Sequence, residues 1–195
     1  MPGAEPGLGV DRGRRYGDWA SREAHEAQER DTPLMCQTAY SRRAKVPIMP
    51  IYADRASGKS YPDARSLVNA YLVQFGERAA AAIDPLDEGG YTQLRRGSAR
   101  IGINVLEDHG VLLLVAPVMP VPMTGHETLF RRLLELSFLT TSDAAFALDT
   151  HRNEIVVRAL RRLSGLDYEE FEDLLDTVGR VTDDWDDRLR AEFAQ

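Results

Sequence analysis

The stretch LLELSFLTTSDAAFALD, residues 133–149, is where a helical pattern gives way to a strand pattern. Its leucines follow helical spacing, whereas Phe146 and Leu148 alternate with smaller residues. Residues 140–143, TTSD, are poor helix-interior residues because their short polar side chains compete for backbone hydrogen bonds. We therefore expect a helix, a short polar loop and then a strand.

Towards the C-terminus, AAFALD and EIVVRAL are separated by THRN, which predicts a second hairpin with its turn at residues 150–153. Asp167 and Glu170 then resemble a capping box, a pair of side chains that closes the start of a helix. The helix that follows carries one apolar stripe. Its members are Phe171, Leu174, Leu175, Val178, Trp185 and Leu189.

Towards the N-terminus, the apolar spacing from Val68 to Ile83 predicts a helix that enters at Pro62-Asp63 and is ended by Pro85. Strand patterns follow in YTQLRR and in RIGINVLEDHGVLLLVAPV, with a hairpin turn at residues 107–110. A second capping box, Thr124 to Glu127, opens the helix that leads into residues 133–149.

The expected order is helix, three strands, helix, two strands, helix. Strand runs joined by tight turns and separated by single helices indicate an α+β fold with an antiparallel sheet. We expect residues 63–195 to form this domain. We expect residues 1–31 to be a weakly ordered tail with at most a short helix around WASREAHEAQER. We expect residues 32–62 to form an extended arm, because Pro47 and Pro50 exclude a central strand.

The composition points to an ordinary globular protein, with 43% hydrophobic and 28% charged residues. A net charge of −7 argues against nucleic-acid binding, and the longest apolar run is too short and proline-rich for membrane insertion. The start of the chain has no secretory signal, and the single Cys36 fits a reducing cytoplasmic location.

Motifs for chemistry are weak, and we predict no catalytic, cofactor-binding or metal-binding residue. Gly58-Lys59-Ser60 resembles the end of a P-loop, but Ala53 stands where the first glycine belongs and Pro62 follows. DTHRNE, residues 149–154, lacks the glycine and the final glutamate of a calcium loop. The four histidines have no metal-ligand spacing. A solvated loop or turn is the favoured interpretation of each.

The arrangement is similar to the type III secretion chaperone-like superfamily, which includes the bacterial secretion chaperones and the YbjN-type domains. The resemblance rests on residues 133–149, the two-sided apolar strand VLLLVAPV and the amphipathic last helix, and it covers residues 63–193. It implies a small acidic cytosolic protein, commonly a homodimer, that binds another polypeptide and is not an enzyme.

Secretion chaperones hold an extended client segment against apolar patches, so the resemblance implies a partner-binding surface. The candidates are Leu112, Leu114 and Val118 on the apolar strand and Ile48, Met49, Ile51 and Tyr52 in the arm. Both faces of the strand could instead be covered within the chain or by a dimer mate. Two alternatives stay open: a structural subunit that docks through its N-terminal extension, and a nucleotide-binding enzyme that uses Gly58–Ser60.

Overall fold

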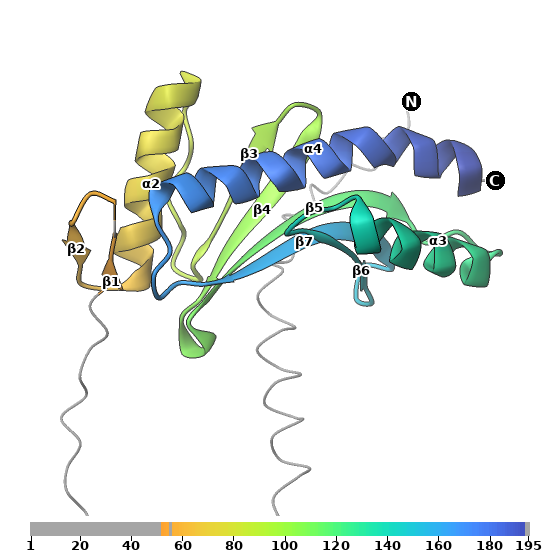
Figure 1. The fold of residues 1–195 in the computed structure, drawn as a ribbon, viewed down its shortest axis with the longest axis horizontal. Coiled ribbons are helices and arrows are strands. Elements are labelled where there is room, and N and C mark those ends of the chain that lie inside the picture. Colours follow the sequence, from red (N-terminus) through yellow and green to blue (C-terminus); the bar gives the residue numbers. More distant parts are fainter. Residues whose placement is uncertain (1–51, 55, 194–195) are drawn as a thin grey trace, which may run out of the picture.

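The computed structural model describes residues 52–54 and 56–193, which form a five-stranded antiparallel sheet with three helices and a separate two-stranded hairpin (Figure 1). The elements are β1 (Tyr52–Ala53), β2 (Ser60–Tyr61), α2 (Ala64–Ala79), β3 (Tyr91–Arg96), β4 (Ala99–Leu106), η1 (Glu107–His109), β5 (Val111–Pro120), α3 (His126–Leu139), β6 (Ala145–Asp149), β7 (Glu154–Arg162) and α4 (Tyr168–Phe193).

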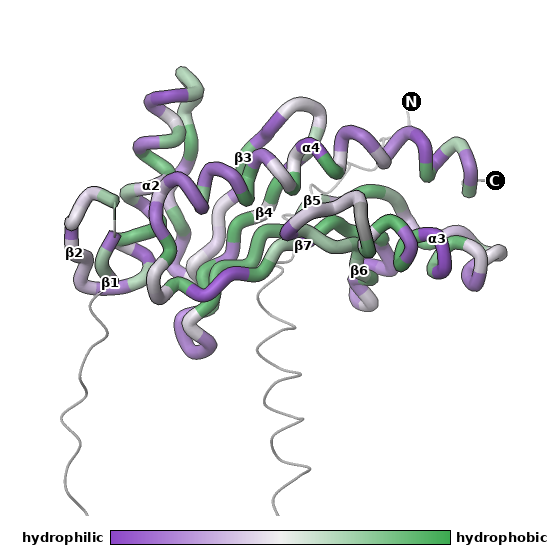
Figure 2. Tube along the Cα trace, viewed as in Figure 1, coloured by the Kyte–Doolittle hydropathy of each residue, from purple (hydrophilic) through white to green (hydrophobic). Residues whose placement is uncertain are grey.

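The order of strands across the main sheet is β3-β4-β5-β7-β6, and every neighbouring pair is antiparallel. The α+β class and the order of helices and strands expected from the sequence are thus confirmed. β5 lies at the centre of the sheet and carries apolar residues on both faces. Figure 2 shows hydrophobic residues concentrated along β4, β5 and β7 and hydrophilic residues along much of α4.

The main core lies between the sheet and the helices. The stripe expected on the last helix is confirmed: Phe171, Leu175 and Leu189 are fully buried, and Trp185 packs at the edge of the core. The start of α4 is capped as expected at Asp167, whose side chain accepts a hydrogen bond from the Glu170 amide at 2.9 Å. The acidic residues of α4 lie mainly on the side turned away from the sheet.

The junction at residues 133–149 is held by one hydrogen bond within the backbone and one to a serine side chain. α3 ends where the Thr140 amide donates to the Leu136 carbonyl at 2.9 Å. Ser137 then accepts a hydrogen bond from the Phe146 amide at 3.1 Å, which ties the last turn of the helix to β6. This stretch therefore directs the chain from a helix into the edge strand of the sheet.

The two remaining helix starts differ from each other. Asp63 caps α2 as expected, accepting a hydrogen bond from the Ser66 amide at 2.6 Å. The capping box expected at Thr124 is wrong, because Gly125 occupies the capping position with φ +78° and no side chain caps α3. Only glycine adopts such a backbone readily, so the helix starts one residue later than the Thr124–Glu127 pattern requires.

Candidate functional site

The structure places the three strand residues predicted to bind a partner inside the protein. Leu112, Leu114 and Val118 expose 0%, 1% and 1% of their surface and pack in the core between the sheet and the helices. Contact with a partner through these side chains would require α4 to leave the sheet. Their burial agrees with the alternative in which the strand is covered within the chain.

The arm residues are mostly outside the part of the chain that the structure describes. Ile48, Met49 and Ile51 fall there, and their role stays a prediction. Tyr52 begins β1 and packs half-buried against the core. The hairpin of β1 and β2 contacts α2, so the last residues of the arm lie against the domain.

Asp54 fixes this hairpin to the domain. It exposes 2% of its surface and accepts a hydrogen bond from the Tyr71 hydroxyl at 2.6 Å, while its other oxygen accepts one from the Ser57 amide. Burial is the largest influence and raises the pKa of Asp54, but the hydrogen bonds from Tyr71 and Ser57 outweigh it and leave that pKa below its ordinary value. The hydroxyl of Tyr71 also lies 3.0 Å from the Leu166 carbonyl before α4.

The P-loop-like residues lie in the turn of the same hairpin. The Gly58 amide donates to the Asp54 carbonyl, and the Lys59 carbonyl accepts from the Asp54 amide, both at 2.9 Å. A P-loop presents its free amides to phosphate at the start of a helix, whereas this loop closes a hairpin and α2 begins only at Ala64. The geometry therefore favours the turn interpretation of Gly58–Ser60.

The other weak motifs are also turns or solvated side chains. The side chain of Asp149 accepts hydrogen bonds from the His151 and Arg152 amides at 3.0 and 3.1 Å, which is a hairpin turn rather than a calcium loop. Within residues 52–54 and 56–193, no group of three or more His, Cys, Asp or Glu side chains could hold a metal ion. No helix in these ranges is both long and apolar enough to cross a membrane.

Among the residues that the structure describes, a concave site lies between the end of α2 and the edge strand β3. This α2–β3 cavity has a volume of about 490 Å³. Its apolar part comes from Phe75, Ala79, Leu94 and residues 81–83, and the rest is lined by Gln93, Arg95, Arg96 and Arg100. The lining is therefore about equally polar and apolar, and a hollow that combines apolar side chains with a few polar groups is a candidate binding site.

The cavity exists because α2 ends earlier than its alanine-rich sequence predicts. Ala80 adopts a left-handed conformation with φ +50°, and the Ala81 amide donates to the Gly76 carbonyl at 3.0 Å. A side chain at Gly76 would meet the Ala81 carbonyl oxygen at 2.8 Å, so glycine permits this close turn. Ile83, expected on the helix, instead follows the turn and packs at the edge of the core.

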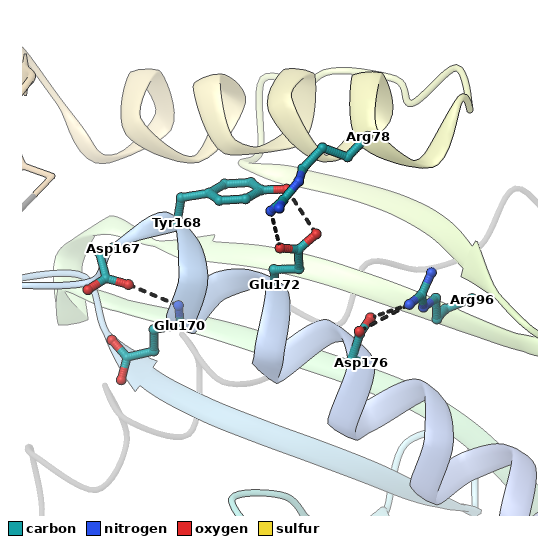
Figure 3. Close-up of polar contacts among 7 residues, drawn as sticks. All are labelled: Arg78, Arg96, Asp167, Tyr168, Glu170, Glu172 and Asp176. Carbon is teal, nitrogen blue, oxygen red and sulfur yellow. Dashed lines mark hydrogen bonds and ion pairs between the residues drawn. The ribbon is translucent and has the colours of Figure 1, made fainter. Parts of the chain in front are cut away.

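The arginines of the cavity have different environments. Arg96 forms an ion pair with Asp176 of α4 at 2.9 Å, visible in Figure 3, and its guanidinium lies 5.9 Å from the centre of the Phe75 ring. Arg95 and Arg100 are exposed and directly opposite each other on β3 and β4. Neither has an ion pair with any described residue, and like charges in such a position repel. This pair would be stabilised by an anionic partner.

Neighbouring ion pairs keep the helices in place around the cavity. Figure 3 shows Arg78 of α2 reaching Glu172 of α4, which also accepts a hydrogen bond from the Tyr168 hydroxyl at 3.2 Å. Arg161 of β7 pairs with Glu170 in the same helix. These exposed pairs each contribute little stability, but together they orient α4 across the sheet and beside α2.

A second apolar surface lies on α3. Leu134 and Phe138 are one helical turn apart and expose 73% and 81% of their surface. On the opposite side of the helix, Leu129, Leu133 and Leu136 are buried in the core. We call the Leu134–Phe138 side the outer face of α3; large apolar side chains paired in this way are typical of protein contact surfaces.

The α2–β3 cavity and the outer face of α3 could be predicted from the sequence only in part. Arg95 and Arg96 are adjacent and basic, but the opposition of Arg95 and Arg100 depends on the register of two strands. The cavity depends on the left-handed Ala80, and alanine is the strongest helix former. A helical plot of α3 would place Leu134 opposite Leu136, but the apolar residues of this helix do not by themselves tell which side is covered.

Comparison with known proteins gives one family match. The model of the Tir chaperone protein (CesT) family matches residues 71–185, which run from the middle of α2 into α4 and include the whole five-stranded sheet. A comparison with curated proteins finds no match.

Two of the solved structures that match this chain share its fold. The crystal structure of the ExsC–ExsE complex matches with a TM-score of 0.56 and 26% identity, covering 65% of this chain and 96% of that chain. The HopA1–SchA chaperone–effector complex has a TM-score of 0.50 and 13% identity, covering 62% and 94%, and shows the fold alone. The crystal structure of YbjN from E. coli matches with a TM-score of 0.38 and 15% identity, covering 58% and 87%.

Proposed function

Because the chain belongs to the Tir chaperone protein (CesT) family, we propose that it is a non-enzymatic chaperone that binds another polypeptide in the cytosol. The family match agrees with the resemblance that residues 133–149 indicated. The ExsC–ExsE structure, at 26% identity, is a complex of two proteins, which supports a binding role for the shared fold. The absence of any convergent chemical motif in the sequence is consistent with binding rather than catalysis.

The observation that carries the proposal is the α2–β3 cavity with its unpaired arginines. An apolar side chain of the client fills the hollow beside Phe75 and Ile83, and a client carboxylate lies near Arg95 and Arg100. Burying one such side chain contributes about 1.5–3 kcal/mol, whereas an exposed ion pair contributes about 0–1 kcal/mol. The apolar anchor therefore supplies most of the affinity at this site, and the arginines select an acidic neighbour.

The test begins with purification of the full chain from its native cell and identification of the polypeptide that accompanies it. Ala82→Trp fills the exposed mouth of the cavity, and Arg100→Glu reverses the charge beside it. We expect each variant to weaken binding of the identified polypeptide at least tenfold in a titration with purified components. Arg180→Glu is the matched control, because Arg180 is exposed on α4 and has no ion pair with any described residue. Equal binding by all three variants would place the client elsewhere.

We also propose that the chaperone is a homodimer that pairs through the outer face of α3. Leu134 and Phe138 supply the apolar centre of a contact between two copies, and burying both side chains contributes several kcal/mol, about 1.5–3 for each. A symmetric dimer needs a self-complementary patch, and two antiparallel helices bearing the same pair satisfy this need.

A structural subunit that docks through its N-terminal extension is the alternative. The β1–β2 hairpin favours it in one respect, because Asp54 and Tyr71 anchor the end of the extension to the domain. Light scattering separates the two functions. If removal of residues 1–51 abolishes entry into a large assembly while client binding at the cavity is unaffected, the subunit function is the correct one. The deletion stops before Tyr52 so that the hairpin remains.

A further inference from the structure

The face of the sheet turned away from the helices has a definite composition. Strand register places Asn104, Leu113 and Leu160 in one row across β4, β5 and β7, and Val115 and Arg158 in the next. We call this side the outer face of the sheet. Its apolar centre is the cluster of Leu113, Val115 and Val156, bordered by Tyr91, Leu106 and Ala147.

This apolar centre is buried, although no described helix lies on it. Leu113 exposes 6% of its surface and Val115 exposes 4%. In Figure 1, α2 and α4 lie on the other side of the sheet, and the contacts of α4 with β3, β4, β5 and β7 are made from there. A bare sheet face leaves its apolar side chains partly open to water, so the outer face requires a cover.

Asn104 supports the same conclusion independently. It lies between Tyr91 and Leu113 on the outer face and exposes 3% of its surface. Its side-chain Nδ2 has no hydrogen-bond partner among the described residues. A buried amide without a partner costs about 1–3 kcal/mol, so the cover is expected to bring an acceptor to this position.

The charge around the outer face restricts what the cover can be. Arg158 and Arg162 on β7 and the Arg95–Arg100 pair share this face, and none of the four has an ion pair with a described residue. The whole chain has a net charge of −7, so this basic rim is a local exception. The basic rim favours an acidic segment as the cover, and the small apolar centre requires that this segment have a small apolar side.

One segment of the chain itself has this chemistry. Residues 19–31, WASREAHEAQERD, contain Ala20, Ala24 and Ala27 at helical spacing, and Glu23 and Glu26 lie to one side of them. With Glu29 and Asp31 the segment has four acidic residues against two arginines, Arg22 and Arg30, and a net charge of −2. Asp18 precedes the segment as a helix-capping residue, and Pro33 ends it. A helix of this length spans about 20 Å, and five strands about 4.8 Å apart span about 19 Å.

We propose that residues 19–31 dock as an amphipathic helix on the outer face of the sheet in the same chain. The alanine side lies on Leu113, Val115 and Val156, and Glu23 and Glu26 lie against Arg158 and Arg162. The linker from Asp31 to Tyr52 reaches about 65 Å when extended, far more than the width of the sheet. A tether of this kind gives an effective concentration of the order of millimolar, which favours the segment over a second copy or an unlinked partner.

Disulfide trapping in the full chain tests this docking. Cys36→Ser removes the native thiol, and Ala24→Cys with Leu160→Cys places one thiol on each partner surface. The control pair is Ala24→Cys with Val73→Cys, because Val73 is 63% exposed on α2, on the opposite side of the molecule's sheet. We expect the first pair to form an intramolecular disulfide at least ten times faster than the control pair.

Charge reversal adds a second readout. Glu23→Arg with Glu26→Arg should slow the first disulfide to the rate of the control pair, and adding Arg158→Glu with Arg162→Glu should restore it. Equal rates for the two pairs, a disulfide that links two chains, or rates indifferent to charge would each overturn the proposal. Because these variants leave the α2–β3 cavity and Arg100 unchanged, client binding can be measured on them separately, and a failure of the docking is distinguishable from a failure of the proposed function.

Discussion

At the scale of single residues, the Tyr71 hydroxyl links three parts of the chain. It extends from α2 and lies within hydrogen-bond distance of Asp54 in the β1–β2 hairpin and of the Leu166 carbonyl before α4. Tyr71→Phe removes the donor and leaves a buried carboxylate with one partner fewer. We expect a loss of about 1–3 kcal/mol in the free energy of unfolding, measured by urea denaturation. Tyr61→Phe is the control, because Tyr61 is only half-buried; an equal loss in both variants would contradict a specific role for Tyr71.

The same carboxylate makes stability depend on pH. Because the pKa of Asp54 is lower in the folded protein than its ordinary value, its stabilising contribution is present above that ordinary value, about 3.9, and is lost as the pH falls through the lower folded value. The difference in unfolding free energy between the natural chain and Asp54→Asn should therefore be constant from pH 7 to 5 and shrink below pH 4. A difference that grows on acidification would mean that burial, not hydrogen bonding, dominates at Asp54.

At the scale of elements, the junction between α3 and β6 should respond to mutation according to burial. Leu133 exposes 6% of its surface, so Leu133→Ala should cost about 2–5 kcal/mol in unfolding free energy. Phe146 is half-buried, so Phe146→Ala should cost less than a full core truncation. Val73→Ala on an exposed site should change stability by less than about 0.5 kcal/mol, and thermal melting orders the three variants.

The elements that sequence predicted well are those specified by neighbouring residues. The start of α2 at Asp63 and the turn at Asp149 each depend on a side chain within four residues of the group it binds. The end of α2 could not be predicted in this way, because it depends on contacts between residues that are not paired by any local pattern. Ala80 adopts a left-handed backbone conformation, the missing side chain of Gly76 leaves room for the Ala81 carbonyl, and Ile83 then packs against the core. The start of α3 was mispredicted for a similar reason. The pattern of side chains from Thr124 to Glu127 does not reveal that Gly125 adopts a positive φ and takes the capping position.

The candidate site was predicted less well than the fold. Alternation along β5 shows two apolar faces, but it does not say which one packs under α4, and Leu112 and Leu114 proved to be core residues. The cavity combines residues from α2, β3 and β4, so it follows from the tertiary arrangement rather than from any one motif. The opposed pair of Arg95 and Arg100 became visible only with the register of the strands.

At the scale of the whole molecule, the outer face of α3 lies apart from the α2–β3 cavity and the outer face of the sheet, which share the Arg95–Arg100 pair at their border. If two copies pair through α3, both cavities remain open at the far ends of their sheets, because α2 and β3 lie away from α3 in Figure 1. A dimer would then present two client sites at once, and a client long enough to reach both would gain affinity from their linkage.

Dimer formation is tested by placing charge on the outer face of α3. Phe138→Asp puts a carboxylate at the centre of the proposed contact, where desolvation opposes pairing, so the variant should sediment as a single chain of 21.8 kDa at concentrations where the natural chain has twice that mass. Val73→Asp adds the same charge to an exposed site on α2 and should leave the mass unchanged. Because Phe138 is 81% exposed in one chain, its substitution should not unfold the monomer, which circular dichroism can verify. A natural chain of single mass, or a Phe138→Asp variant of double mass, would show that α3 is not the dimer contact.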